Sequence, residues 1–172
     1  MATAASDVVD RFLDALDRLD VACTCTVGHE AGDVLKSIVE PPAVGTALPV
    51  EGDVLEAANV TLSPTADDLR AARTGVTAAR LGVADYGSIV IESWGDATEA
   101  TSLWPPLHVA VLRATDVVPD MATAFEHLSR HIRDGCTSAI LATGPSATAD
   151  MGALVRGAHG PERVHVLLID DR

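Results

Sequence analysis

The sequence predicts a three-layer α/β protein in which helices cover both faces of a largely parallel β-sheet. Strand-like and helical segments alternate along the chain, most regularly after residue 106. The length of 172 residues is enough for one hydrophobic core and too short for two ordinary domains. Only five residues are aromatic, so the core has to be aliphatic, as buried parallel strands are. We expect a single domain over residues 1–172.

The first elements are expected to be a helix and a strand. Apolar residues recur at spacings of four and three over residues 8–19, which predicts an amphipathic helix. Residues 21–27 read VACTCTV, and their alternation predicts a strand. Cys23 and Cys25 share a face with two valines, so we expect both thiols to be buried.

The middle of the chain predicts short elements and one long loop. Thr65 and Asp68 form a capping-box-like start for a helix over residues 66–74, which Gly75 ends. Residues 93–106 contain Gly95 and two adjacent prolines and predict a long loop, and such loops are often functional. The other expected elements are a short helix over 31–39 and strands over 43–50, 59–62, 81–85 and 88–92.

The last part of the chain carries the strongest α/β pattern. Residues 107–112 predict a strand, and residues 120–133 predict a helix with one apolar face. The remaining elements are a buried strand over 136–143, a short helix over 149–155 and a final strand over 164–169.

The chain is acidic throughout, with 25 Asp and Glu against 12 Lys and Arg, a net charge of −13 and Lys36 as the single lysine. This charge makes nucleic acid a poor partner. It also makes the folded chain repel itself in dilute buffer, which concentrated salt would screen. We therefore expect a protein of a salt-rich cytoplasm, as in a halophilic archaeon. An ordinary acidic mesophilic protein is the alternative.

The expected location is the cytoplasm. No segment approaches the run of about 18 apolar residues that a membrane span needs, and the first residues lack the basic and apolar regions of a signal peptide. The chain has three cysteines, an odd number that implies no disulfide framework in a reducing compartment.

Two patterns have the spacing of metal ligands. Cys23, Cys25 and His29 could suit zinc or an iron–sulfur centre, but no fourth ligand is apparent and burial explains the cysteines equally well. His127 and His131 stand four apart on the predicted helix, at the flank of its apolar stripe, where polar residues are expected anyway. We expect this chain to bind no metal and no cofactor.

Two loops could bind an anion or present a reactive group. Residues 143–150 follow a predicted strand and open a predicted helix, where free N–H groups attract anions, and Ser146 and Thr148 add hydroxyls. An ordinary helix start is the alternative, because this loop has no lysine or arginine. Asp85 stands beside Gly87 at a strand junction and could act as acid, base or nucleophile, although a turn with an Asp–backbone hydrogen bond would look the same.

The order of several short motifs resembles the LUD-domain family, also called the lactate utilisation protein C (LutC/YkgG) family. The resemblance covers residues 75–170, while residues 1–74 match only in their pattern of elements. The motifs are Gly75-Val-Thr77 with Ala79, Ala84-Asp85-x-Gly87-Ser88, Trp104-Pro-Pro-Leu-His108, Gly144-Pro-Ser146-x-Thr148-Ala-Asp150, Ala158-His-Gly-Pro161 and Val164-His165-Val166.

The resemblance implies a fold like that of the NagB/RpiA/CoA-transferase group. It also implies a part in the oxidation of L-lactate to pyruvate, beside partner subunits that carry iron–sulfur clusters. The family's signature residues fall here on Thr77, Asp85, Gly87, Ser88, Pro105, Pro106, His108, Gly144, Pro145, Ser146, Thr148, Asp150, His159, Gly160 and Pro161. Two positions depart from the family pattern. Tyr86 replaces a small hydroxyl residue, and Ala147 replaces a basic residue in the anion loop.

These residues predict one pocket at the carboxyl ends of the parallel strands, where ligands of such sheets gather. Its predicted members are Asp85 as a catalytic group with Gly87, Ser88, Gly144, Ser146 and Thr148 as binding residues, roofed by residues 93–106. His108 and His159 precede their strands and are expected outside the pocket. If the strand at residue 107 ran antiparallel, His108 would enter the pocket as a second catalytic group.

The leading hypothesis is an accessory subunit of a cytoplasmic lactate-oxidation system. Its clusters and electron transfer would belong to partner chains, since this chain has no cysteine quartet. One alternative is a stand-alone enzyme of acyl-CoA transfer or sugar-phosphate isomerisation that uses Asp85, for which fold analogy is the argument. The other is a module that binds a small organic anion.

Overall fold

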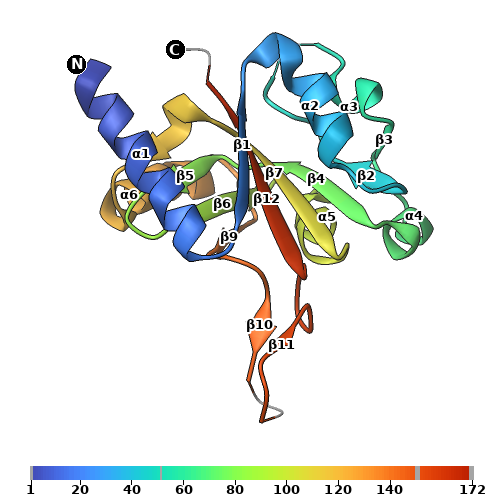
Figure 1. The fold of residues 1–172 in the computed structure, drawn as a ribbon. Coiled ribbons are helices and arrows are strands. Elements are labelled where there is room, and N and C mark those ends of the chain that lie inside the picture. The colour runs from blue at the N-terminus through green and yellow to red at the C-terminus, as the bar shows by residue number, and fades with distance from the viewer. Residues whose placement is uncertain (1, 51, 150–151, 171–172) are drawn as a thin grey trace.

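The computed structural model describes residues 2–50, 52–149 and 152–170. Its main feature is a six-stranded sheet in the order β1-β12-β7-β4-β2-β3, in which all neighbouring strands are parallel (Figure 1). The predicted α/β class with a parallel sheet is therefore confirmed. The strands are β1 (Ala22–Thr26), β2 (Ala43–Gly45), β3 (Val60–Leu62), β4 (Thr74–Ala78), β7 (Leu107–Arg113) and β12 (Arg163–Ile169).

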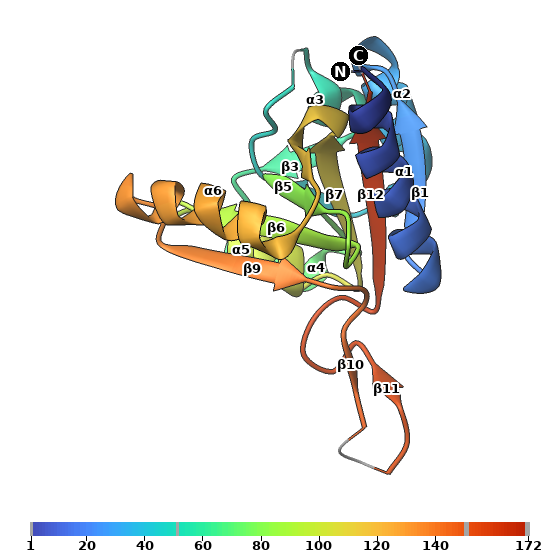
Figure 2. The same cartoon turned by 90° about the vertical axis from the view of Figure 1, so that its left-hand side faces the viewer.

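A second, four-stranded sheet has the order β8-β5-β6-β9, with β6 antiparallel to both of its neighbours. Its strands are β5 (Leu81–Val83), β6 (Ser88–Ser93), β8 (Val117–Val118) and β9 (Ser138–Ala142). Two further short strands, β10 (Ala147–Thr148) and β11 (Val155–Arg156), pair with each other and form an arm that projects from the body of the molecule (Figures 1 and 2).

The helices are short apart from the first and the last. The α-helices are α1 (Ala2–Arg18), α2 (Ala31–Ile38), α3 (Val54–Ala57), α4 (Ala66–Ala71), α5 (Thr98–Leu103) and α6 (Met121–Arg133), and the 3-10 helices are η1 (Gly28–Glu30) and η2 (Ala114–Asp116). The predicted capping box at the start of α4 is present, with Thr65 accepting from the Asp68 N–H and Asp68 accepting from the Thr65 N–H. Within the described part of the chain, no helix has the length and apolarity needed to cross a membrane.

The parallel sheet is buried on both faces because successive side chains of its central strands point in opposite directions. Val109, Val111 and Leu167 pack against α2 and α3 on one face. Ala110 and Leu112 pack on the other face, against α1 and the second sheet. The outer surface of the second sheet is covered in turn by α6, so this half of the molecule has one layer more than predicted (Figure 2).

The structure corrects several predicted elements. The strand expected over residues 136–143 is present as β9 (Ser138–Ala142), but in the second sheet and antiparallel to β6. The helix expected over residues 149–155 is not seen in the described residues of this range, 149 and 152–155, which belong to the arm. Gly75 lies inside β4, a strand that the sequence analysis missed, and the loop expected over 93–106 contains α5.

Candidate functional site

A small cavity of about 140 Å³ lies between the amino ends of β7 and β12, the second sheet and α5. Its polar wall comes from segments far apart in the sequence. They contribute Ser102 of α5, His108 of β7, Ser146 before β10 and His159 after β11. Ile91, Ile140 and Val164 are among the apolar lining residues. The cavity therefore combines an aliphatic lining with hydroxyl and imidazole groups, as small-molecule sites commonly do.

His108 is a buried polar group of this cavity, with 2% of its surface exposed. Its Nε2 lies 2.9 Å from the Oγ1 of Thr77 in the neighbouring strand β4. Burial lowers the pKa of His108 from 6.5 to about 4, so the ring is neutral near pH 7. A neutral imidazole has one N–H donor and one acceptor nitrogen, and the contact with Thr77 engages one of them.

Ser146 is positioned by the loops at the base of the arm. Its backbone N–H donates to the carbonyl of Pro161 at 2.9 Å, and its carbonyl accepts from the N–H of Gly157 at 2.9 Å. Its hydroxyl accepts from the N–H of His159 at 3.4 Å. Gly160 packs against Ser146 so closely that an added Cβ would lie 3.2 Å from the Cβ of Ser146. The hydroxyl is thus fixed beside His159 in the cavity wall.

Helix α5 forms another wall because it contacts the backbone of β4 directly. A Cβ added to Gly75 would lie 1.9 Å from the carbonyl oxygen of Thr101, a distance that no side chain can occupy. Only glycine at this position lets the helix approach the strand so closely. Gly75 therefore sets the position of Ser102 and Leu103 over the cavity.

A larger groove of about 710 Å³ adjoins the cavity. The groove and the cavity are both lined by Leu103 of α5 and by His159 and Gly160, which follow β11. These three residues form the wall between the groove and the cavity. The groove wall also contains Glu99 and Trp104, and Trp104 is 65% exposed. A groove of this volume is within the range of ordinary ligand sites.

The comparisons with known proteins bear on this site. The sequence pattern of the LUD domain family matches residues 53–169, which is more than half of the chain and includes α5, His108 and the arm. This chain belongs to the LUD domain family. The family resemblance of the sequence is thereby confirmed.

Relatives of this LUD domain include Lactate utilization protein C of Bacillus velezensis, which is 35% identical over 105 residues, 59% of this chain and 44% of that protein. The YkgG protein of Escherichia coli is 32% identical over 106 residues, 58% of this chain and 45% of that protein. The matched part of the chain thus spans less than half the length of either relative. A DUF162 family protein of Deinococcus radiodurans has the same fold, with a TM-score of 0.73, 17% identity and coverage of 96% of this chain and 98% of that one.

The structure of the LUD domain brings together only part of the predicted pocket. Gly144 and Ser146 line the cavity with His108 and His159. The prediction that both histidines lie outside the first layer of pocket residues is therefore wrong. The prediction assumed that the strand before residue 144 belongs to the parallel sheet, which would put the following loop at the carboxyl ends of the strands. That strand, β9, lies in the second sheet instead. The segment after it therefore leads to the amino end of β12, where His108 also lies.

The other predicted residues do not line this cavity. Asp85 is in the turn between β5 and β6, where its Oδ1 lies 3.0 Å from Nη1 of Arg11 in α1. Gly87 has a φ of +64° in the same turn and packs against α1. The Ser88 hydroxyl lies 2.7 Å from the Thr143 hydroxyl. Thr148 is in the arm, and Asp150 is outside the described residues.

Ser102 was not predicted as a site residue, because residues 93–106 carry no helical pattern strong enough to place it on α5. It also placed both strand β1 cysteines in the interior. The structure leaves Cys23 partly buried and Cys25 exposed, because β1 is an edge strand that α1 covers only in part. Burial, together with the nearby Cys25, raises the pKa of the Cys23 thiol to about 12.

Proposed function

We propose that this LUD domain acts in L-lactate utilisation as a subunit that works with partner chains carrying iron–sulfur clusters. The observation that carries the proposal is family membership together with the similarity to proteins named Lactate utilization protein C, 35% and 34% identical in two Bacillus species. Oxidation of lactate to pyruvate releases electrons, and iron–sulfur clusters are suitable acceptors for them.

The cysteines of the chain support placing the clusters in partners. Common clusters of this kind take four thiolate ligands, and this sequence has three cysteines. Cys136 is buried in the loop before β9 of the second sheet, against the Ser93 and Ser138 carbonyls, whereas Cys23 and Cys25 are in β1 of the first sheet.

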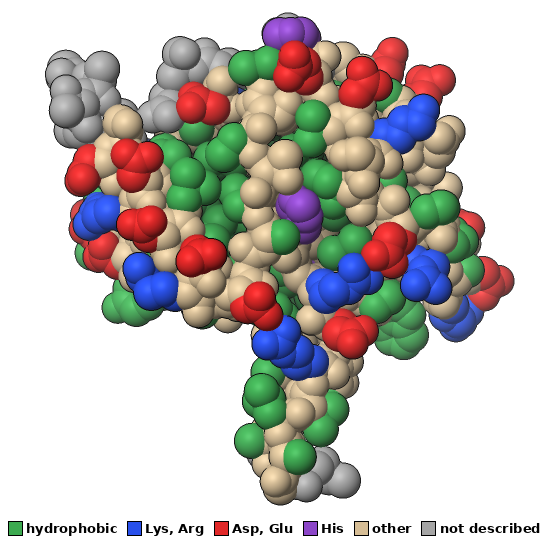
Figure 3. All heavy atoms as spheres, viewed as in Figure 1, with side chains coloured by type: hydrophobic (Ala, Val, Ile, Leu, Met, Phe, Trp, Pro, Cys, Tyr) green, Lys and Arg blue, Asp and Glu red, His purple; other side chains and the backbone are tan. Residues whose placement is uncertain are grey.

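The surface beside the groove supports contact with another subunit. Trp104 and Leu103 are exposed at its wall, and Leu154 and Val155 are exposed on the arm. Figure 3 shows hydrophobic side chains along this projecting arm, whereas acidic side chains are spread over the body. Exposed aromatic and aliphatic side chains of this kind are typical of subunit interfaces.

The geometry gives no support to the alternatives built on Asp85 or on anion binding in the cavity. The Asp85 carboxylate pairs with Arg11 outside the cavity, which leaves it no substrate site there. The cavity lining contains no lysine or arginine that would hold a phosphate or an acyl-CoA. We therefore keep the subunit role as the proposed function.

Deletion of the gene in its native host tests this proposal. We expect the deletion strain to lose growth on L-lactate and to keep growth on pyruvate, because only the oxidation step is affected. The wild-type gene should restore growth on lactate, and Ser146→Ala should restore it less well if the cavity takes part. Unchanged growth on lactate in the deletion strain would contradict the proposed function.

A further inference from the structure

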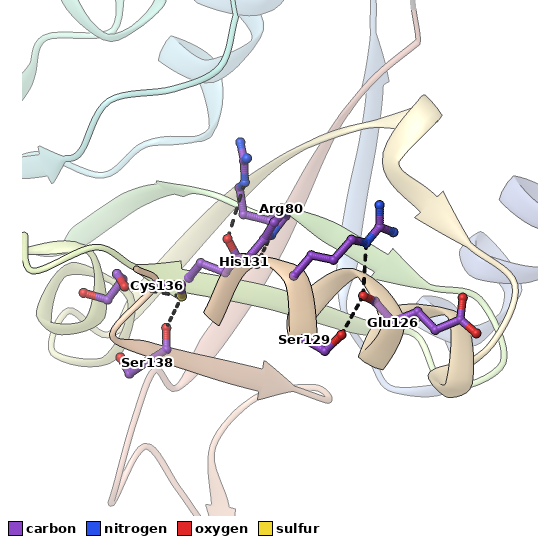
Figure 4. A network of polar contacts seen from close by, with 9 residues as sticks. Arg80, Glu126, Ser129, His131, Cys136 and Ser138 are labelled. Atoms are coloured by element: carbon purple, nitrogen blue, oxygen red, sulfur yellow. Dashed lines mark hydrogen bonds and ion pairs between the residues drawn. The ribbon is translucent and has the colours of Figure 1, made fainter. Parts of the chain in front are cut away.

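The cavity at His108 has an uncharged lining. None of the described residues that line it is a lysine, arginine, aspartate or glutamate, although 22% of the chain is charged. Glu92 follows Ile91 in β6 and points to the opposite face of the strand, where its Oε1 lies 2.6 Å from Nδ1 of His131. Figure 4 shows Arg80 and His131 side by side in that network. Because an unpaired charge is costly to bury, the cavity favours an uncharged ligand.

The proton on the His108 ring can be located from the partner of the ring. Thr77 is fully buried, and in the described part of the chain its hydroxyl has one hydrogen-bond partner, Nε2 of His108 at 2.9 Å. If Nε2 donated to Thr77, the threonine proton would be buried without an acceptor, which costs free energy. The Thr77 hydroxyl therefore donates to Nε2, and the neutral ring carries its own proton on Nδ1.

The Nδ1 atom of His108 is the nitrogen that remains for a ligand. No described residue forms a hydrogen bond with Nδ1. Nδ1 is also not one of the unpartnered side-chain atoms that are completely enclosed, so it keeps accessible surface. Since His108 lines the cavity, this surface faces the cavity. An N–H group in this position needs an acceptor from a ligand.

The two serines of the cavity wall differ in what they can donate. The Ser102 hydroxyl donates to the carbonyl of Glu99 at 2.8 Å and has no further proton. The Ser146 hydroxyl accepts from the N–H of His159, and no described residue accepts the proton of Ser146. The wall therefore offers two donors, on His108 and Ser146, and a carbonyl oxygen has two lone pairs that can accept from both.

The remaining wall determines the body of the ligand. Ile91, Ile140 and Val164 give it an aliphatic surface, which favours a carbon chain. The volume of the cavity is about 140 Å³. An apolar cavity of about 150 Å³ holds one benzene molecule, so the ligand has roughly six non-hydrogen atoms or fewer.

We propose that this cavity binds a small uncharged carbonyl compound. The carbonyl oxygen accepts from Nδ1 of His108 and from the hydroxyl of Ser146, and the carbon chain packs against the aliphatic wall. The proposal rests on the lining of the cavity. It does not depend on the proposed role in lactate utilisation, because lactate is an anion, which this lining disfavours.

Titration with butanone, followed by nitrogen NMR of isotope-labelled histidines, tests the proposal. Without ligand, we expect the His108 ring to show a protonated Nδ1 and an unprotonated Nε2, and His108→Phe assigns these signals by removing them. Butanone should shift the Nδ1 signal with a dissociation constant in the millimolar range, as expected for so few atoms. Propionate has the same skeleton with a carboxylate in place of the ketone, and should bind at least tenfold more weakly.

Substitutions in the wall locate the bound ketone. His108→Phe keeps a ring and removes one donor, and Ser146→Ala removes the other, so we expect each to weaken butanone binding about fivefold or more. Saturation transfer to the ligand measures binding to these variants. Ala142→Leu fills the cavity without removing a polar group and should abolish binding. Circular dichroism checks that each variant is folded, and Ala142→Val offers a milder change.

A matched pair of threonine substitutions tests the role of the His108 proton. Thr77→Val removes the hydroxyl that holds this proton on Nδ1, so we expect Nε2 to become partly protonated and butanone to bind more weakly. Thr24→Val removes the equivalent hydroxyl from a second pair, in which Thr24 Oγ1 lies 2.9 Å from Nε2 of His165. Neither residue of this second pair lines the cavity, and binding should stay unchanged.

Four results would overturn the proposal. They are an unprotonated Nδ1 on His108, equal binding of propionate and butanone, butanone binding that is unchanged in the folded Ala142→Leu or Ala142→Val variant, and no response to butanone up to high millimolar concentration. None of these results bears on growth of the deletion strain, so failure of this proposal and failure of the proposed function can be told apart.

Discussion

His108 is a titratable residue that is buried and also lines the cavity. Its ring is enclosed between β4 and β12 and is neutral, because burial lowers its pKa to about 4. In the unfolded chain the pKa returns to about 6.5. The unfolded state therefore binds a proton between pH 6.5 and pH 4 that the folded state does not bind.

This difference predicts a pH dependence of stability. Above pH 6.5 the group has no effect, and as the pH falls toward 4 the folded state loses up to roughly 3 kcal/mol from this one histidine. We expect His108→Gln to lose less stability than the wild type over this window, measured as free energies of unfolding in urea at several pH values. His29→Gln, a change at an exposed ring, is the control. Parallel pH profiles of wild type and His108→Gln would contradict this account.

The three cysteines should differ in reactivity. Cys25 is exposed, whereas burial raises the pKa of Cys23 to about 12 and also raises that of Cys136. Because the thiolate is the reacting form, we expect one thiol per native chain to react quickly with a disulfide reagent at pH 8. Cys25→Ser should abolish this fast reaction. Fast reaction of two or three thiols would contradict the burial of the Cys23 and Cys136 thiols.

At the scale of elements, the contact between α5 and β4 controls the cavity. Gly75→Ala forces the Thr101 carbonyl away from the strand, and we expect it to lower the free energy of unfolding by about 3 kcal/mol or more. Gly95→Ala is the matched control, because its Cβ meets nothing within 4 Å and only the φ of +81° opposes it, at about 1–2 kcal/mol. Equal losses in the two variants would show that the close contact is not needed.

The elements also show what could be predicted from sequence. Long periodic segments such as α6, and the capped start of α4, were predictable because local spacing and capping determine them. Strand β4 was missed because Gly75 reads as a helix stop, although here it serves contact with α5. The arm was predicted as a helix because a β10–β11 pair of two residues each leaves almost no alternation to detect.

The site was harder to predict than the elements. His108, Gly144 and Ser146 were identified by their motifs, but their meeting at the amino end of β12 depends on a second sheet that no local pattern specifies. The buried carboxylate of Glu92, next to the cavity residue Ile91, was not identified at all. Glu92 sits among the apolar residues of β6, and its partner His131 is 39 residues away in the sequence.

At the scale of the whole molecule, the charge of −13 should dominate the response to salt. Acidic side chains are spread over the surface that Figure 3 shows, and they repel one another in dilute buffer. We expect the melting temperature to rise between dilute buffer and molar potassium chloride, through screening and stronger apolar burial. A melting temperature that stays flat or falls would contradict a salt-rich native environment.

The central proposal is that this LUD domain works beside iron–sulfur partner chains, and native co-purification tests it most directly. The tagged chain is expressed from its own locus in cells grown on L-lactate and isolated without oxygen in molar potassium chloride. We predict that cysteine-rich chains co-elute in fixed proportion, with iron and acid-labile sulfide. The same isolation from cells grown on pyruvate is the control. Recovery of the chain alone from lactate-grown cells, without iron or sulfide, would contradict the claim.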